Sequence, residues 1–265
     1  MIVFNECCIR SMKRMKDNFI DLTVCSPPYD SIRKYQGFEF PFDEISKELY
    51  RVTKPGGVVV WIVNDQVIYG SESGTSFKQA LYFMECGFKL HDTMIYEKNG
   101  ATFPARRDGN RYTQIFEFRF VFSKGKPKTA NLLCDKENIY RGDKPHKTKF
   151  RNKEGELISR IQKPVPKFSP RNNIWRYVTG KYCSTKDEVA FEHPAIFPEL
   201  LANDHILTWS EENDIVYDLC GGSGTTGIMA HKNNRKFIMS EISKEYCEII
   251  KKRFRTRFNK EVTIL

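Results

Sequence analysis

A glycine-rich segment indicates the fold class: Asp214-Ile-Val-Tyr-Asp-Leu-Cys-Gly-Gly-Ser-Gly-Thr-Thr-Gly227. A short apolar run from Asp214 to Leu219 leads into a glycine-rich turn, and a helical stretch from Gly227 to His231 follows. Glycines let the backbone turn tightly and approach a ligand. Open α/β sheets bind nucleotides where a strand ends and a helix begins. The stretch therefore predicts a nucleotide-type ligand at the carboxyl end of a sheet strand.

Two other glycine motifs compete for this turn. A phosphate-binding P-loop requires a lysine directly after its last glycine, and none of the glycines here is followed by one. A dinucleotide fingerprint, G-x-G-x-x-G, is matched formally by Gly222 to Gly227. On this motif alone, a nicotinamide or flavin enzyme stays open.

An acidic residue follows the next apolar run. Lys236 to Ser240 is a predicted strand, and Glu241 comes 19 residues after Gly222. A carboxylate at about this distance can accept hydrogen bonds from both hydroxyls of a ribose. The alternative is a surface acid at the end of a strand. Together the turn and the acid predict an adenosine-containing cofactor.

The rest of the chain alternates short apolar runs with amphipathic helical stretches. Helices are expected at Phe42 to Val52, ending at Lys54-Pro55-Gly56-Gly57, and at Ser76 to Cys86. The pattern is typical of α/β proteins with a mostly parallel sheet covered by helices. Seven strands are expected, at residues 1–4, 21–25, 57–63, 90–96, 116–122, 214–219 and 236–240. They suit one doubly wound, Rossmann-like sheet.

Residues 124–181 break this alternation. They hold 16 lysines and arginines against five acidic residues, a net charge of +11, whereas the whole chain carries +10. A solvated loop is one interpretation, because charge runs are usually exposed. The other is an electrostatic platform for a phosphate backbone. Aromatic side chains between the charges favour the second, because they could order the segment or contact bases: Tyr140, Phe150, Phe168, Trp175, Tyr177 and, just beyond it, Tyr182.

Composition sets wider limits. The positive charge favours an anionic partner without separating DNA from RNA or a membrane surface. The eight cysteines form no C-x-x-C pair and show no zinc spacing, so we expect reduced thiols and no metal. The first residues lack the apolar stretch of a secretory signal, and no apolar run is long enough to span a bilayer. We expect a cytoplasmic protein without a membrane partner.

A second turn carries the sharper signal. Ser26-Pro27-Pro28-Tyr29 directly follows the predicted strand Asp21 to Cys25. Two consecutive prolines remove two N–H donors and force extended geometry on the residue before each. The result is a stiff shelf of carbonyl acceptors beside one hydroxyl and one aromatic ring. The alternative is a purely structural role, in which the turn is a rigid strand exit with a packed tyrosine.

Such a shelf suits the exocyclic amine of a base. That nitrogen is a poor nucleophile because its lone pair is delocalised into the ring. If the Ser26 hydroxyl and the Pro27 carbonyl accept its two hydrogens, the lone pair is freed and developing positive charge is stabilised. Tyr29 can stack on the base, a contact worth about 1–3 kcal/mol. The turn predicts transfer of a methyl group to an amino group held in line.

Taken together, these residues resemble the β-class, circularly permuted DNA amino-methyltransferases of restriction–modification and phage systems. The resemblance covers nearly the whole chain outside the insertion and displaces the dehydrogenase interpretation. The matching blocks, in the family's order, are VCSPPYD (24–30), LYRVTKPGGVVVW (49–61), GFKLHDTMIYEK (87–98), FEFRFVFSKGKP (116–127), EHPAIFPELL (192–201), DLCGGSGTTG (218–227) and RKFIMSEISKEYCEI (235–249).

The resemblance implies S-adenosylmethionine as cofactor, double-stranded DNA as substrate, and three parts. Residues 1–123 are the catalytic part, 124–181 the target-recognition insertion, and 182–265 the cofactor-binding part. Ser26, Pro27 and Tyr29 match the catalytic turn. The family's cofactor-site positions correspond to Asp218, Gly222, Gly224 and Thr225 in the glycine loop, Glu241 as the ribose-binding acid, and His193, Pro194 and Phe197 beside the methionine end.

Serine at the first catalytic position is the form usual in N4-cytosine enzymes, which makes cytosine N4 the expected target and adenine N6 the alternative. One departure from the family concerns the loop that commonly reads D-P-F-x-G-S-G, where Leu219 and Cys220 replace Pro and Phe. The missing ring weakens the expected adenine pocket. A catalytically silent DNA-binding relative therefore stays open as an alternative. An RNA amino-methyltransferase is a further alternative.

DNA recognition is expected to include base flipping, because the target amine is paired inside a duplex. Arg106, Arg107 and Arg111 are the expected contacts to phosphates beside the flipped nucleotide, with solvated surface arginines as the alternative. The insertion is expected to read base edges in the major groove. A homodimer and a cognate restriction endonuclease as partner both stay open.

Overall fold

A nine-stranded sheet forms the centre of the larger of two compact units in the computed structural model, which describes residues 1–28, 40–100, 110–139, 141–142 and 144–265. The larger unit comprises Met1–Asn131 and Asn173–Leu265, and the smaller one comprises Leu132–Asn172. The strands of the sheet lie in the order β12 (Ile174–Tyr177), β6 (Lys89–Lys98), β7 (Phe116–Ser123), β3 (Thr53–Val63), β2 (Ile20–Cys25), β13 (Ile215–Asp218), β14 (Lys236–Ser240), β1 (Ile2–Phe4) and β15 (Thr263–Ile264).

All seven predicted strands lie in this sheet, and two short edge strands, β12 and β15, are additional. Only β7 runs antiparallel to its neighbours β3 and β6, so the sheet is mostly parallel, as expected for the α/β class. The Lys54-Pro55-Gly56-Gly57 segment was predicted as a turn before the strand but belongs to β3. Gly56 adopts φ +79° there, and the Gly56 amide donates to the Lys124 carbonyl at 2.7 Å, so glycine lets the irregular start of the strand pair with its neighbour.

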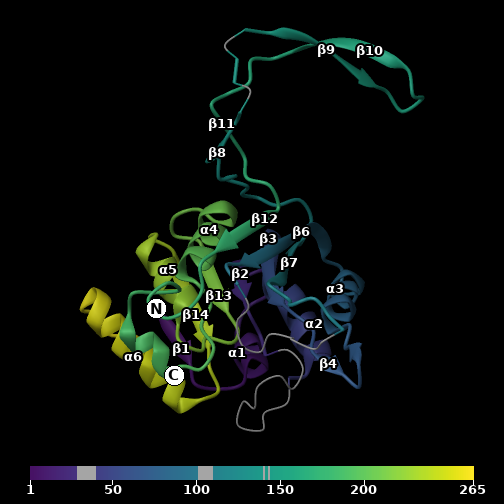
Figure 1. Cartoon of the computed structure of the whole chain (residues 1–265). Helices are drawn as coiled ribbons and strands as arrows, with labels where there is room; N and C mark the ends of the chain where they lie inside the picture. The colour runs from purple at the N-terminus through teal and green to yellow at the C-terminus, as the bar shows by residue number, and fades with distance from the viewer. Residues whose placement is uncertain (29–39, 101–109, 140, 143) are drawn as a thin grey trace. The chain divides into compact units, whose positions relative to one another are not determined.

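Helices cover both faces of the sheet (Figure 1). On one face, side chains of α1 (Cys8–Arg14), α2 (Phe42–Val52) and α3 (Thr75–Glu85) join the core cluster with alternate residues of β3, Val59, Trp61 and Val63. The remaining helices, α4 (Glu199–Trp209), α5 (Thr225–Lys232) and α6 (Lys244–Phe258), cover the other face, where Val58, Val60 and Ile62 point. Successive side chains of β3 therefore pack alternately into the hydrophobic layers on the two faces of the sheet.

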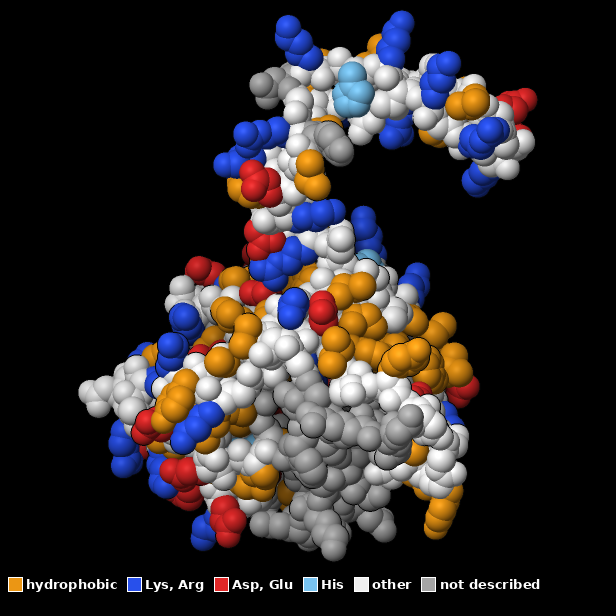
Figure 2. All heavy atoms as spheres, viewed as in Figure 1, with side chains coloured by type: hydrophobic (Ala, Val, Ile, Leu, Met, Phe, Trp, Pro, Cys, Tyr) orange, Lys and Arg blue, Asp and Glu red, His pale blue; other side chains and the backbone are white. Residues whose placement is uncertain are grey.

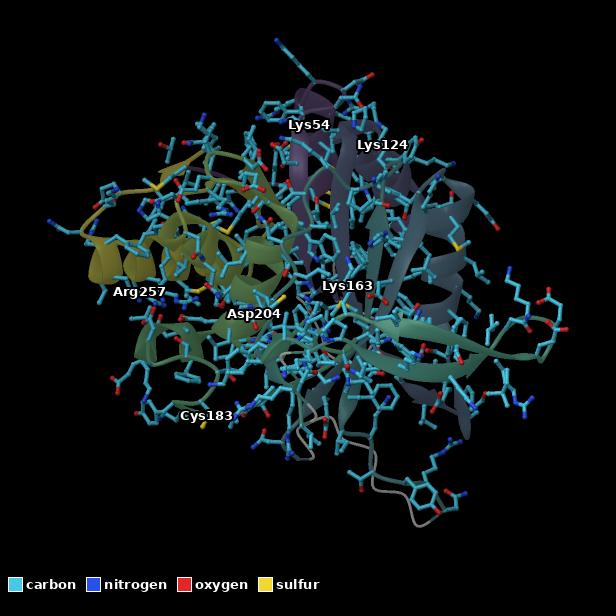
Figure 3. All side chains as sticks on the ribbon, turned by 90° about the horizontal axis from the view of Figure 1, so that it is seen from above. Lys54, Lys124, Lys163, Cys183, Asp204 and Arg257 are labelled. Carbon is cyan, nitrogen blue, oxygen red and sulfur yellow. The ribbon has the colours of Figure 1, made fainter. Side chains whose placement is uncertain are left out.

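The edge where β3 begins and β7 ends is closed by polar contacts. Lys54 donates to Asp21 at 2.6 Å, and Lys124 donates to the Tyr50 carbonyl at 2.7 Å. The two lysines lie near one another at this edge (Figure 3). The carboxyl ends of the parallel strands lie at the opposite edge, where the predicted site residues follow their strands.

The smaller unit consists of two short ladders. β9 (His146–Arg151) pairs antiparallel with β10 (Leu157–Gln162), and β8 (Lys136–Glu137) pairs antiparallel with β11 (Phe168–Ser169). The unit lies within the range expected for the insertion. Trp175 and Tyr177, which we expected in that insertion, instead belong to β12 of the main sheet and are buried. They pack inside the larger unit and are not available to contact bases.

Candidate functional site

The two motif turns lie at the point where the sheet order reverses. From β13 the chain continues outward through β14, and from β2 it continues the other way through β3, so β13 and β2 are neighbours at a topological switch point. Ligands of open α/β sheets bind in the crevice at such a point. Tyr217 pairs with Thr23, and Asp218 pairs with Met239. Continuing these registers places Cys220 between Ser26 and Glu241.

A cavity of about 550 Å³ lies at this edge and joins both turns. The predicted residues that line it come from the catalytic turn, the glycine loop, the strand-end acid and the segment before α4: Ser26, Pro27, Gly222, Thr225, Glu241, His193, Pro194 and Phe197. A catalytic turn remote from the glycine loop would have made methyl transfer between them impossible. The structure instead brings them to one cavity.

The glycine turn owes its shape to two left-handed residues. Gly222 adopts φ +51°, and a Cβ there would lie 3.2 Å from Nε2 of His193. Gly224 adopts φ +80° and caps α5, where a Cβ would lie 3.0 Å from Cγ1 of Ile250. Gly224 does not line the cavity. Gly222 therefore opens space for a ligand, whereas Gly224 lets the turn pack on α6.

Glu241 closes the same turn from the neighbouring strand. Its Oε2 accepts from the Gly222 amide at 2.7 Å, and its Oε1 accepts from the Ser243 amide at 2.8 Å. The side chain is buried, and this burial raises the pKa of the carboxyl group, although the amide hydrogen bonds act in the opposite direction. The acid thus borders the cavity with both oxygens oriented by backbone.

Asp218 lies behind the turn and does not line the cavity. Its Oδ1 accepts from the Cys220 amide at 3.1 Å. The carboxyl group is 2% exposed, and burial raises its pKa to about 7, against the opposing effect of hydrogen bonds from Thr226 and Cys220. Asp218 therefore holds the loop through a backbone hydrogen bond from outside the cavity, although we expected it to contact the cofactor.

The segment before α4 borders the cavity beside the glycine turn. The Nδ1 atom of His193 accepts from the Ala195 amide at 3.1 Å, and its ring meets Tyr246 edge-on with centroids 4.3 Å apart. Pro194, Phe197 and Tyr246 line the cavity as well. Tyr246 was not predicted, because nothing in the sequence near it distinguishes a cavity residue from an ordinary residue of an amphipathic helix.

Three predicted residues, Tyr29, Arg106 and Arg107, lie outside the described residues. Arg111 is described, and its guanidinium donates to the Gly70 carbonyl beside the short hairpin of β4 (Val67–Ile68) and β5 (Ser71–Glu72). It does not line the cavity. The remaining part of the catalytic turn, Ser26 to Pro28, does.

Sequence reasoning missed a buried arginine that ties the glycine turn to α6. Arg253 is fully buried, and its Nη1 donates to the Ser223 carbonyl at 2.6 Å. Its guanidinium also lies 2.7 Å from Asp187 and 2.9 Å from Glu199. Pairing with two carboxylates compensates the cost of burying the charge. No local signal marks Arg253, because its partners lie far away in sequence.

Cysteines gather beside the loop. Cys7, Cys8 and Cys220 line the cavity, and all eight cysteines are free thiols. Cys220, where the resemblance leads one to expect a phenylalanine, thus contacts the cavity with a smaller side chain. Within the described ranges, no group of three or more His, Cys, Asp or Glu side chains is arranged to hold a metal ion. In the same ranges, no helix has the length and apolar character needed to cross a membrane.

Comparison with known proteins agrees with this geometry. The model of a DNA methylase family that groups N6- and N4-methyltransferases matches residues 20–252. The chain belongs to this family. The family match replaces the nicotinamide or flavin alternative that the glycine motif had left open.

Relatives of this N4/N6 methyltransferase cover the chain nearly from end to end. The orphan methyltransferase M.BamHII of Bacillus amyloliquefaciens is 58% identical over 91% of this chain and 92% of its own length. The solved structure of the PvuII DNA methyltransferase, described as cytosine-N4-specific, matches with a TM-score of 0.72 at 19% identity, covering 95% of this chain and 85% of its own. A putative DNA modification methylase from Thermus thermophilus, complexed with S-adenosyl-L-methionine, matches with a TM-score of 0.66 at 20% identity, covering 99% and 97%. Membership of the N4/N6 methyltransferase family and the α/β fold are therefore established for this chain.

Proposed function

We propose that this DNA methyltransferase transfers a methyl group from S-adenosylmethionine to the exocyclic amine of a flipped base, and that the base is cytosine. The observation that carries the proposal is that Ser26 and Pro27 line the same cavity as Gly222 and Glu241. The catalytic turn comes before the glycine turn in the chain, which supports the circularly permuted arrangement.

The residues at the glycine end suit an adenosine-containing cofactor. Gly222 lacks the Cβ that would crowd His193, so backbone is exposed to the cavity there. Glu241 supplies an oriented acceptor for ribose hydroxyls, and His193, Pro194 and Phe197 would border the methionine end. When bound, the cofactor supplies an electrophilic methyl group on a sulfonium.

The chain's own residues prepare the amine. Ser26 and Pro27 follow β2, whose residues up to Cys25 are buried, so the shelf is held by a rigid strand. Oxygen acceptors at Ser26 and Pro27 bind the two amine hydrogens, which localises the lone pair on nitrogen and stabilises the positive charge that develops there. Cytosine is the preferred target because serine stands at the first position of the turn.

The smaller unit supports a role in DNA recognition. Residues opposite each other in a ladder point to the same face. The register pairs Lys147 with Ile161, Lys149 with Ser159 and Arg151 with Leu157, so these three cations share one face of the hairpin, about 7 Å apart along β9. Figure 2 shows lysine and arginine side chains along this hairpin.

A two-stranded ribbon of this size fits the major groove of DNA. The cation face of β9 suits phosphates, and the other face carries the hydrogen-bonding side chains His146, Thr148, Arg160 and Gln162 for base edges. Arg106, Arg107 and Arg111 are proposed to contact phosphates beside the flipped nucleotide.

Incubation with cofactor labelled in the methyl group and mixed-sequence duplex DNA, followed by mass spectrometry of the nucleosides, tests the proposal. N4-methylcytosine is the expected product. N6-methyladenine would keep the reaction and move the target to adenine. Methyl transfer to structured RNA but not to duplex DNA, or tight DNA binding without cofactor binding in calorimetry, would overturn the proposed function.

A further inference from the structure

A lysine and a glutamate face the cavity on the side of the sheet away from the glycine turn. Lys98 is the last residue of β6 and Glu117 the second residue of β7, and both line the cavity. The Lys98 Nζ atom lies 2.6 Å from Oε1 of Glu117, and the two side chains are 15% and 10% exposed. Taking two charges largely out of water is costly, so an ion pair in a cavity wall suggests use by a ligand.

Strand order shows which ligand the pair faces. β6 lies three strand intervals from β2 and five from β14. At about 4.8 Å an interval, Lys98 starts roughly 14 Å from the strand of Ser26 and roughly 24 Å from that of Glu241. The ion pair draws the ammonium toward β7, which is the side of β2. Across the strands, a lysine stem of roughly 6 Å leaves about 8 Å to the strand of Ser26. Along the strands, the registers place Ser26 level with Met94, so Lys98 lies four residues farther out, and a base held at Ser26 that extends outward along this edge approaches it.

The chemistry of the base selects the partner. In cytosine and in adenine, the ring nitrogen beside the exocyclic amine, N3 or N1, is a hydrogen-bond acceptor. Thymine and guanine carry an N–H at the ring position beside their O4 or O6 carbonyl. An ammonium group can only donate. An amine held at Ser26 and Pro27 therefore places an acceptor toward Lys98 only in the two bases that can be methylated by this family.

We propose that Lys98 donates a hydrogen bond to the ring nitrogen next to the target amine and that Glu117 positions the ammonium. The inference rests on the proposed function. Glu117 takes one of the three N–H groups, and its negative charge offsets the cation. The ring nitrogen is then bound without the full electron withdrawal that a lone ammonium would exert on the amine.

The wall behind the pair is rigid. Tyr96, opposite Glu117 in the ladder, is buried. Arg119, two residues further along the same face of β7, is fully buried; it donates to the Ile95 carbonyl at 2.8 Å and lies 4.7 Å from the Trp175 ring. These contacts join β7, β6 and β12, and they keep the ends of β6 and β7 in place for Lys98 and Glu117.

A double-mutant-type cycle tests the contact. The Lys98 side chain and the ring nitrogen of the base are removed singly and together. Wild type and Lys98→Met are assayed on a duplex with cytosine, or with 3-deazacytosine, at the target position; 1-deazaadenine serves if the product is N6-methyladenine. We expect each single change to lower kcat/KM by about 10–100-fold, and the two together to lower it no further. Additive losses would overturn the contact. If wild type methylates no duplex, the proposed function fails and the inference with it.

Controls separate this role from a structural one. Lys89→Met, at the exposed opposite end of β6, is expected to leave both activities unchanged. Cofactor affinity of Lys98→Met should match wild type, whereas its melting temperature should fall because Glu117 loses an ion-pair partner. If Lys98→Met does not fold, Lys98→Gln takes its place. A loss of cofactor affinity with Lys98→Met would show that the ammonium holds the cofactor and would overturn the proposal. Glu117→Gln is expected to lower kcat about 10-fold with little change in KM. An unchanged kcat would show that Glu117 does not position the Lys98 ammonium.

Discussion

The carboxylate of Glu241 accepts a hydrogen bond from the Gly222 amide at 2.7 Å, which joins the strand-end acid directly to the glycine turn. The same carboxylate accepts from the Ser243 amide, so its orientation is fixed before any ligand arrives. Preorganised acceptors bind with less loss of conformational freedom. This relationship makes Glu241 a support of the turn, and the proposed ribose-binding role would use the same carboxylate.

Glu241→Ala should therefore weaken cofactor binding by at least about 10-fold, because a buried acceptor for ribose hydroxyls is removed. Isothermal calorimetry with S-adenosylmethionine measures the change. Glu245→Ala, in the exposed first turn of α6, is the matched control and should bind as wild type does. Unchanged affinity in Glu241→Ala would take the residue out of the cofactor site.

Ser26→Ala should lower kcat by about 10²–10³-fold with cofactor affinity unchanged, because the hydroxyl acts on the amine and not on the sulfonium. Single-turnover methylation and calorimetry give the two values. Ser71→Ala, on an exposed strand, should change neither. Equal losses in turnover and in cofactor affinity would contradict the role given to the catalytic turn.

Asp218 predicts a pH dependence of stability. Burial raises its pKa to about 7, so between about pH 4 and pH 7 the folded chain holds a proton that the unfolded chain releases. The free energy of unfolding should fall as pH rises through this window, by at most ~4 kcal/mol from this group. Asp218→Asn should flatten the fall but not abolish it, because the pKa of Glu241 is raised as well. Urea unfolding at pH 4.5 and pH 7.5 checks this. If the free energy of unfolding falls by the same amount in wild type and in Asp218→Asn, the prediction is wrong.

Gly224 and Gly125 form a matched pair, with φ of +80° and +83°. Alanine at either carries the same left-handed strain of roughly 1–2 kcal/mol. At Gly224 a Cβ also meets Ile250 at 3.0 Å, whereas at Gly125 no atom lies within 4 Å. Gly224→Ala should lower the free energy of unfolding, measured in urea, by about 1–3 kcal/mol more than Gly125→Ala does. Equal losses would mean that the turn does not depend on close packing against α6.

The charged face of β9 can be tested by its salt dependence. Replacing Lys147, Lys149 and Arg151 together by glutamine should reduce the slope of log K against log salt by up to about 2.7, at ~0.9 for each phosphate that a removed cation had neutralised. Fluorescence anisotropy with duplex DNA measures the slope. The control replaces three exposed lysines of the larger unit, Lys47, Lys232 and Lys260. An unchanged slope in the β9 variant would place phosphate binding elsewhere.

The strands and turns were predictable because their signals are local. Apolar runs marked the seven strands, and glycine or proline marked both motif turns within a few residues. β12 and β15 were missed because four and two residues are too short for a periodic pattern. The resemblance placed Asp218 and Gly224 in the cofactor site. In the structure, both residues support the glycine loop from outside the cavity.

Local sequence signals were enough to predict the fold class, the two motif turns and the acid that follows the glycine turn, because backbone preference and hydrophobic period act between near neighbours. The folded arrangement places β2 beside β13, and so brings Ser26 to the same cavity as Gly222. It alone paired Lys98 with Glu117 and Arg253 with the glycine turn. Such contacts depend on which strands and helices become neighbours, and that choice is made by packing over long separations that no local pattern records.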